Sequence, residues 1–220
     1  MDGAAGEKLR LAHVPYPVTA PGPGRRIGVW FQGCRVHCRG CMAKDTWDVD
    51  DGQTVGFADL MDLFRSFPNP EVTGTTVSGG EPFDQPEALG VLVTWLRESY
   101  CRPDQDILLY SGYGKEMLVR EHPETISMID ALISEPFVEL FATHAALRWR
   151  GSSNQLLTVF STLGRLRYES EVDAPSHGDL QVGVDEDRVS IIGVPRPGDL
   201  QRLEDALAER GIRLEEASWR

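Results

Sequence analysis

Short apolar runs alternate with helical patterns along residues 26–134. A run of apolar residues that stops at glycine or at polar residues predicts a buried strand, and apolar residues that recur every three or four positions predict a helix. The predicted strands are residues 26–33, 73–80, 106–112 and 128–134, and the predicted helices are residues 57–64, 86–99 and 114–121. Strands that alternate with helices indicate an α/β fold with a parallel sheet.

Local signals add boundaries to this outline. Thr54 is a candidate N-cap for the first helix, and Pro86 suits the first turn of the second. Residues 1–24 contain four prolines and end in Pro-Gly-Pro-Gly, so we expect them to be irregular.

The character of the sequence changes beyond residue 166. Residues 169–179 have the polar composition of a linker. Two alternating runs, residues 180–184 and 188–194, flank an Asp-Glu-Asp segment and predict a β-hairpin.

A last helix follows the predicted hairpin. Asp199 is its candidate cap and Gly211 its expected end. We therefore expect a main domain over residues 1–166 and a C-terminal extension over residues 167–220, which comprises a linker and a small β-β-α unit. The apolar face of the last helix consists of Leu200, Leu203, Ala206 and Leu207.

Composition limits the kind of protein. The 220 residues suffice for one substantial domain with a buried core. The net charge of −12 disfavours nucleic acid as the main partner, because phosphate binding usually requires a basic surface. No apolar run approaches the length of about 18–20 residues that a membrane span requires, and the N-terminus lacks the features of a secretory signal. We therefore expect a cytoplasmic protein without membrane partners, in which clustered thiols stay reduced and bind metal.

Three of the four cysteines lie within eight positions, at Cys34, Cys38 and Cys41. A structural zinc site requires a fourth ligand. Here that ligand would be His37, which is adjacent to Cys38, or the distant Cys101, which follows a predicted helix and suits a buried thiol. An ordinary [4Fe–4S] cluster also takes four thiolates, whereas three thiolates leave one iron open for a substrate or cosubstrate. The spacing is therefore compatible with zinc and with an open cluster.

Basic side chains gather around the cysteines in this acidic chain. They form either a solvated loop or a docking or anion-binding face beside the metal site. They are Arg25, Arg26, Arg35, His37, Arg39 and Lys44.

Each chemically unusual segment follows a predicted strand. These segments are the cysteines, Ser78–Pro82 and Ser111–Tyr113. Because active sites of parallel α/β folds form where the strands end, we expect the three segments to converge. Taken alone, Gly79–Pro82 is better explained as a turn that ends a strand, and its order after the cysteines favours the site.

The order of these motifs resembles that of radical S-adenosylmethionine (SAM) enzymes, and more narrowly that of the activating enzymes of anaerobic (class III) ribonucleotide reductases. The resemblance covers residues 10–165. The cysteine spacing is common to the superfamily, whereas "WRGSSNQ" combined with "KDTW" is more specific. The matching segments are 22–24, 33–47, 78–83, 111–113 and 149–155.

The resemblance implies a partial (β/α) barrel with a small β-β-α appendage, and a radical mechanism. Cys34, Cys38 and Cys41 would ligate a [4Fe–4S] cluster whose open iron chelates the amino and carboxylate groups of SAM. An electron donor such as flavodoxin or ferredoxin would reduce the cluster, which would cleave SAM to a 5′-deoxyadenosyl radical. The radical would abstract hydrogen from a partner protein and so form a glycyl radical on the reductase.

The resemblance also implies which residues bind SAM. Gly79 and Gly80 would let the backbone approach its methionyl group, and Glu81 would accept a hydrogen bond from its ammonium. The backbone of residues 40–42 would face the adenine, and residues 111–113 would contact the ribose or the charged end. The candidate cosubstrate residues are Gly40, Met42, Ser78, Gly79, Gly80, Glu81, Ser111, Gly112 and Tyr113.

Several segments depart from the family pattern or stay ambiguous. Pro21 stands where the family has Asp or Asn, and Ser134–Glu135 stands where the family has Asp-Gly. Trp149–Gln155 is either a loop that closes the domain or a contact surface for a partner. The C-terminal extension has no counterpart in a minimal activating enzyme, and it either recognises a partner or covers an open sheet edge.

Three functions therefore remain open at this point. The first is installation of a glycyl radical on an anaerobic ribonucleotide reductase. The second is radical chemistry on another peptide or protein, which the C-terminal extension motivates. The third is a non-catalytic iron–sulfur or zinc protein used for electron transfer or structural support.

Overall fold

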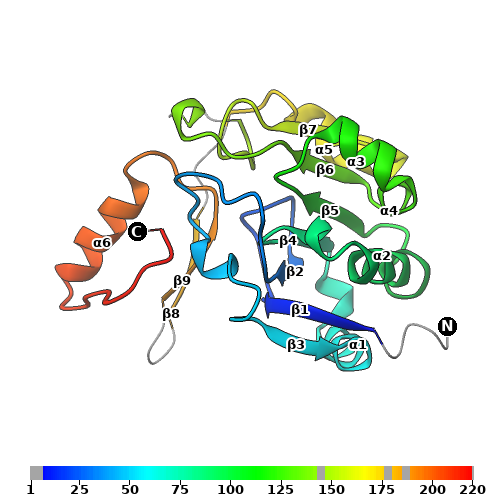
Figure 1. Ribbon diagram of the computed structural model, residues 1–220, viewed down its shortest axis with the longest axis horizontal. Helices are drawn as coiled ribbons and strands as arrows, with labels where there is room; N and C mark the ends of the chain where they lie inside the picture. Colours follow the sequence, from blue (N-terminus) through cyan, green and yellow to red (C-terminus); the bar gives the residue numbers. More distant parts are fainter. Residues whose placement is uncertain (1–6, 143–146, 176–179, 185–188, 220) are drawn as a thin grey trace.

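A computed structural model describes residues 7–142, 147–175, 180–184 and 189–219. It contains a seven-stranded sheet and a separate two-stranded sheet (Figure 1). The large sheet consists of β1 (Lys8–His13), β2 (Arg26–Phe31), β3 (Gln53–Gly56), β4 (Gly74–Gly79), β5 (Asp106–Tyr110), β6 (Ala131–Ser134) and β7 (Leu156–Val159). The small sheet is an antiparallel pair of β8 (Leu180–Val184) and β9 (Val189–Gly193).

The strand order β3-β1-β2-β4-β5-β6-β7 places four parallel strands at the centre of the large sheet. β2, β4, β5 and β6 pair in parallel, one after another. β1, β3 and β7 add antiparallel strands at the two edges. The prediction of an α/β fold with a mostly parallel sheet is confirmed.

Helices follow the strands and lie mainly on one side of the sheet. In Figure 1, α1 to α4 lie to the right of the sheet, and α6 with the β8–β9 hairpin lies to its left. No helix in the described part of the chain combines the length and apolar character needed to cross a membrane. The helices are α1 (Phe57–Ser66), α2 (Pro86–Trp95), α3 (Lys115–Glu121), α4 (Pro123–Ser127), α5 (Thr162–Tyr168) and α6 (Asp199–Ala208), and a π-helical turn (Leu96–Tyr100) extends α2.

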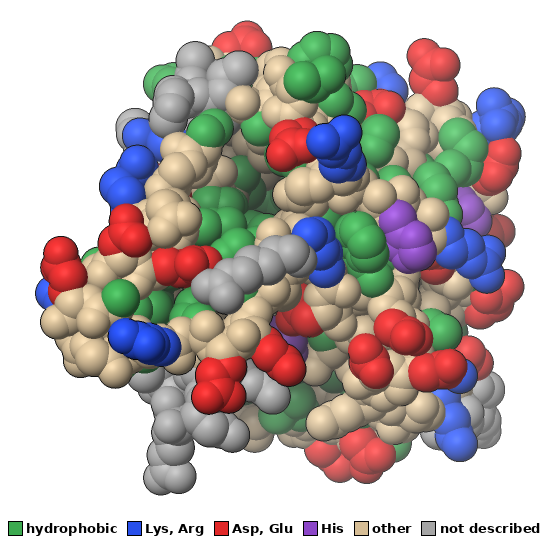
Figure 2. All heavy atoms as spheres, turned by 60° about the vertical axis from the view of Figure 1, so that its left-hand side comes forward, with side chains coloured by type: hydrophobic (Ala, Val, Ile, Leu, Met, Phe, Trp, Pro, Cys, Tyr) green, Lys and Arg blue, Asp and Glu red, His purple; other side chains and the backbone are tan. Residues whose placement is uncertain are grey.

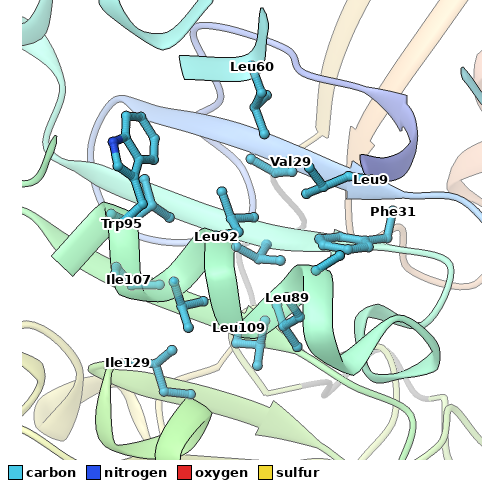
Figure 3. Packing of buried hydrophobic residues seen from close by; sticks show 14 of the residues in the cluster. Leu9, Val29, Phe31, Leu60, Leu89, Leu92, Trp95, Ile107, Leu109 and Ile129 are labelled. Carbon is cyan, nitrogen blue, oxygen red and sulfur yellow. The ribbon is translucent and has the colours of Figure 1, made fainter. Parts of the chain in front are cut away.

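The main core lies between α2 and the sheet. Leu89 and Leu92 of α2 are fully buried and belong to one cluster with Phe31 and Leu109 of the strands (Figure 3). Near the end of the same helix, Trp95 meets further rings of the cluster edge-on. Full burial of one large apolar side chain contributes about 1.5–3 kcal/mol, so this layer is the main apolar contribution to the fold.

The prediction that residues 1–24 are irregular is wrong for β1. Leu9 and Leu11 are buried while Lys8 and Arg10 are exposed, which is the two-residue alternation of a half-buried strand. The proline-rich residues that follow masked this signal. The strands β3 and β7 are four residues long and were also not predicted.

Two predicted helix caps are wrong. Thr54 lies in β3 and pairs with Arg10 of β1, and the residue that precedes α1 is Gly56. Asp199 is the first residue of α6, and its carboxylate accepts a hydrogen bond from the Arg196 backbone N–H at 2.7 Å. The predicted hairpin is confirmed by β8 and β9, whereas its Asp-Glu-Asp segment and residues 176–179 of the expected linker lie outside the described residues.

A buried ion pair lies at the amino ends of the central strands. Arg26 begins β2 with a fully buried side chain, which donates to the Asp106 carboxylate at 2.7 Å and to Thr76 Oγ1 at 2.6 Å. The Tyr168 hydroxyl also donates to Asp106. Arg26 therefore does not belong to a basic face beside the cysteines, because it lies at the opposite end of β2. The neighbouring Arg25 pairs with Glu71 instead.

Removal of one partner of this pair is expected to destabilise the fold strongly. Asp106→Ala leaves the Arg26 guanidinium buried without its counter-charge, which costs about 3–5 kcal/mol. Urea unfolding measures the loss. Asp62→Ala, which removes an exposed partner of Arg65 in α1, is the control and is expected to change little. Equal stability of the two variants would contradict a structural role for the buried pair.

Candidate functional site

The cysteine loop, residues 33–47, begins at the carboxyl end of β2, and its last residues lie beside its first ones. Gly33 has φ +96°, a conformation that favours glycine, and its N–H donates to Thr46 O at 2.9 Å. The Cys34 N–H donates to Trp47 O at 3.1 Å. The two ends of the loop are thereby joined by backbone hydrogen bonds, and the cysteines lie between them.

The three thiols are free and partly exposed. The Cys41 N–H donates to Cys38 O at 3.1 Å, which closes a turn, and the Ala43 N–H donates to Cys41 Sγ at 3.4 Å. Burial raises the pKa of Cys34 and Cys38, whereas backbone hydrogen bonds lower it. At Cys34 these come from His37 and Val36, and at Cys38 they come from Phe137 in the loop after β6 and from its own N–H. Backbone donors that face sulphur stabilise thiolates.

This donor set fits an iron–sulfur cluster. Within the described residues, no three side chains of His, Cys, Asp or Glu converge as the ligands of one metal ion do. A cubane cluster binds each cysteine through a different iron, so its ligands need not converge on one point. Three half-exposed sulphurs on one loop, with backbone N–H groups near them, match that requirement.

Two glycines hold β4 against the cysteine loop. The Gly80 N–H donates to Phe31 O and the Glu81 N–H donates to Gly33 O, each at 2.8 Å. A Cβ on Gly80 would lie 2.2 Å from Gly33 O, and Gly79 has φ +107°. The close approach that these glycines make in the structure is to the backbone of β2 and of the cysteine loop. Their approach to the methionyl group of SAM stays a prediction.

Glu81 joins the ends of β4 and β5. Its buried carboxylate accepts hydrogen bonds from Ser111 Oγ at 2.9 Å, from the Gly112 N–H at 2.7 Å and from the Phe83 N–H at 3.0 Å. Burial raises the pKa of Glu81 to about 7, although the three hydrogen bonds act in the opposite direction. The structure thus brings Glu81 and the segment Ser111–Tyr113 together, as predicted from their positions after neighbouring strands.

Asp84 is a further site residue that the sequence analysis missed. Its carboxylate accepts from the Arg35 N–H at 2.7 Å and from the Tyr113 hydroxyl at 2.8 Å. It therefore connects the cysteine loop to the segment after β5. Its place two residues after the Gly-Gly-Glu-Pro motif was the available signal.

A cavity of about 1910 Å³ opens beside the cysteine loop. Its lining includes five of the predicted site residues, whereas the other predicted ones lie outside it. Aromatic side chains of Trp30, Tyr110 and Trp149, which were not predicted, also line it. Figure 2 shows a recess with hydrophobic side chains on this side of the molecule. The five predicted residues that line the cavity are Gly40, Cys41, Met42, Ser78 and Gly79.

The family of this chain follows from comparison with known proteins. Residues 20–158 match a family profile described as "4Fe-4S single cluster domain". An anaerobic ribonucleoside-triphosphate reductase-activating protein of Vibrio cholerae is 31% identical over 157 residues, which cover 68% of this chain and 97% of the relative. Proteins of the same name from Escherichia coli K12 (30% identity, 66% of this chain, 96% of the relative) and from phage T4 (30%, 62% and 85%) also match. The chain belongs to the family of anaerobic ribonucleoside-triphosphate reductase-activating proteins. The resemblance inferred from the motifs is thereby confirmed.

His37 and Cys101, the two residues considered as a fourth metal ligand, contact other parts of the protein. The His37 ring stacks on Trp47 with ring centroids 4.6 Å apart. Cys101 packs against the main core after the π-helical turn, and burial raises the pKa of its thiol to about 12. Cys101 is partly buried, so the prediction of a buried thiol is met only in part.

The segment Trp149–Gln155 closes the domain against the loop after β6. Asn154 donates to Pro136 O at 2.8 Å, and Ser152 Oγ accepts from the Val138 N–H at 3.1 Å. Glu135, which stands where the family has glycine, has φ +78°, a conformation that costs a non-glycine residue about 1–2 kcal/mol. Its carboxylate accepts from the Lys115 N–H at the start of α3, a contact that glycine could not make.

The contact between Gly80 and the cysteine loop predicts opposite effects at two glycines. Gly80→Ala forces backbone apart and is expected to destabilise the apoprotein by about 1–3 kcal/mol and to lower iron uptake on reconstitution. Gly90→Ala in α2 meets only Thr125 Oγ1, at 3.8 Å, and is expected to be neutral or to stabilise by up to about 1 kcal/mol. Urea unfolding and iron analysis of both variants test this, and equal behaviour would contradict it.

The buried carboxyl of Glu81 predicts a pH dependence of stability. Its pKa is about 7 in the folded chain and 4.5 as the ordinary value, so the folded state binds more protons between these values. The free energy of unfolding should fall as pH rises from about 5 to 8, by up to about 3 kcal/mol, relative to Glu81→Gln. Urea unfolding of both apoproteins at several pH values measures the difference. Parallel pH profiles would show that Glu81 does not titrate in this range.

Proposed function

We propose that this chain is a radical SAM activating enzyme that generates a glycyl radical on an anaerobic ribonucleoside-triphosphate reductase. The observation that carries the proposal is the cysteine loop, which carries three cysteines, borders a large cavity through Cys41 and is held by the backbone of Gly79–Glu81. Family membership supports the same activity, because the relatives are named as activating proteins of that reductase.

Cys34, Cys38 and Cys41 would hold the [4Fe–4S] cluster. When bound, the reduced cluster supplies the electron that cleaves SAM reductively and so provides the radical that abstracts hydrogen from the partner. The contribution of the chain is to hold three thiolates and to leave the fourth coordination site open. Its cysteine loop does so because the described part of the loop offers no fourth thiol.

The cosubstrate would lie in the cavity between the cysteine loop and the strand ends. Ser78 and Gly79 line this cavity at the end of β4, and Gly40 and Met42 line it on the cysteine loop. The Glu81 carboxylate, anchored by Ser111 and Gly112, would place a negative charge behind the glycines for the ammonium of SAM. The aromatic walls would exclude water from the reactive centre.

The architecture fits a partial (β/α) barrel, in which the parallel strands β2, β4, β5 and β6 carry the site at their carboxyl ends. We retain residues 1–166 as the radical SAM domain and residues 167–220 as the C-terminal extension. The electron donor would be an acidic flavodoxin or ferredoxin of the cytoplasm. Arg35 and the largely exposed Arg39, both on the cysteine loop, favour such a donor by charge.

Another protein substrate on the same scaffold is the second candidate. The C-terminal extension favours it, because the extension lies beyond the segment that matches the family profile. A non-catalytic iron–sulfur protein is the third candidate, and cosubstrate cleavage separates it from the other two.

Reconstitution with iron and sulfide under anaerobic conditions tests the proposed chemistry. The wild-type chain is expected to bind about four irons and, after reduction with dithionite, to convert SAM to 5′-deoxyadenosine. Cys38→Ala is expected to lose most of the iron and all measurable product, whereas Cys101→Ala should retain both. Zinc in place of iron, or a loaded and reduced wild-type chain without product, would contradict the proposal.

A further inference from the structure

The C-terminal extension lies outside the family's shared segment but is attached to both sides of the site. The Gln181 side chain of β8 donates to Pro17 O at 2.7 Å and accepts from the Thr19 N–H at 3.0 Å, in the segment between β1 and β2. At the other end, Ser218 Oγ donates to Met42 O at 2.6 Å on the cysteine loop. A linker that merely trails from the domain would make neither contact.

Residues 209–219, which follow α6, form a strap between α6 and the cysteine loop. The Lys44 N–H donates to Ser218 O at 3.3 Å, next to the contact with Met42. The indole N–H of Trp219 donates to Glu204 of α6 at 2.8 Å. The strap therefore contacts the loop directly after the third cysteine.

Between these attachments, the extension forms one wall of the cavity. The opposite wall comes from neighbouring strands of the large sheet, through Trp30, Ser78 and Tyr110. The wall on the extension comes from β9, the start of α6 and the strap, and combines apolar side chains with the charged Arg196, Arg213, Glu215 and Glu216. Its apolar members are Ile191, Ile192, Val194, Leu200, Ile212 and Leu214.

The cavity is too large for the cosubstrate alone. Sites for small molecules and cofactors typically measure about 300–1,000 Å³. The cavity of about 1910 Å³ therefore leaves room for a second occupant next to SAM. Because hydrogen abstraction requires that occupant to reach the cysteine loop, a segment of the partner protein must enter the cavity.

We infer that the C-terminal extension is the substrate wall of this site and receives the segment of the partner protein that carries the hydrogen donor. The inference rests on the proposed function and assigns the extension a role within it. In the described residues β9 pairs with β8 alone, so its other edge offers main-chain donors and acceptors to an extended segment.

Substitutions on this wall should separate partner binding from cosubstrate cleavage. Ile191→Glu places a carboxylate among the apolar members of the wall, and Ser218→Ala removes the hydrogen bond to Met42 O. The probe is the anaerobic ribonucleoside-triphosphate reductase of the same organism. Ile191→Glu is expected to raise the dissociation constant for the reductase about tenfold or more, with a smaller rise for Ser218→Ala. Ile191→Glu should keep dithionite-driven 5′-deoxyadenosine formation near the wild-type rate.

Matched controls lie on helices away from the cavity. Val119→Glu introduces the same charge at an exposed apolar position of α3, and Ser127→Ala removes a hydroxyl that donates to a backbone carbonyl of α4. Both controls should bind the reductase as the wild type does. Unchanged affinity of Ile191→Glu and Ser218→Ala would overturn the inference.

A parallel loss of cosubstrate cleavage in Ile191→Glu would also overturn it, because the wall would then serve SAM. Failure of the proposed function has a different signature. In that case the wild-type chain itself would produce no 5′-deoxyadenosine, whatever its affinity for the reductase.

Discussion

The site depends on a close approach between two backbones. Gly80 lies so near Gly33 that no side chain fits between them, and the hydrogen bonds from Gly80 and Glu81 join β4 to the end of β2 and to the cysteine loop. The Glu81 carboxylate then extends the connection to Ser111 and Gly112 after β5. Three strand ends are thus fixed relative to one another by groups that tolerate little substitution. This rigidity suits a loop whose task is to hold three sulphurs beside a reactive cavity.

The two ends of the central strands have separate tasks. At the amino ends, Arg26 and Asp106 form a fully buried ion pair, and the stability of the fold depends on both partners. At the carboxyl ends, backbone contacts position the cysteine loop and leave a cavity open. The C-terminal extension then closes one side of that cavity, through Gln181 and Ser218. Stability and chemistry therefore depend on different residues of the same strands.

Much of this arrangement could be predicted from the sequence, because its signals are local. An apolar run that ends at Gly33 and a segment rich in β-branched residues that ends at Gly79 marked two of the central strands, and the order of the strands along the chain implied that the motifs would converge. The assignment of Arg26 to a basic face failed because Arg26 and the cysteines lie at opposite ends of β2, a separation that the predicted strand over residues 26–33 already implied. The contacts of Asp84 and Ser218 depend on residues far away in the chain, so no local pattern could predict them. Their distant partners come together only in the folded chain.

Electron paramagnetic resonance of the partner tests the central claim most directly. The anaerobic ribonucleoside-triphosphate reductase would be incubated with the reconstituted, reduced chain and SAM in the absence of oxygen. The predicted result is the doublet signal of a glycyl radical on the reductase, which disappears when SAM is omitted or when Cys38 is replaced by alanine. Formation of 5′-deoxyadenosine without any radical on the reductase would contradict the assignment of that protein as the substrate.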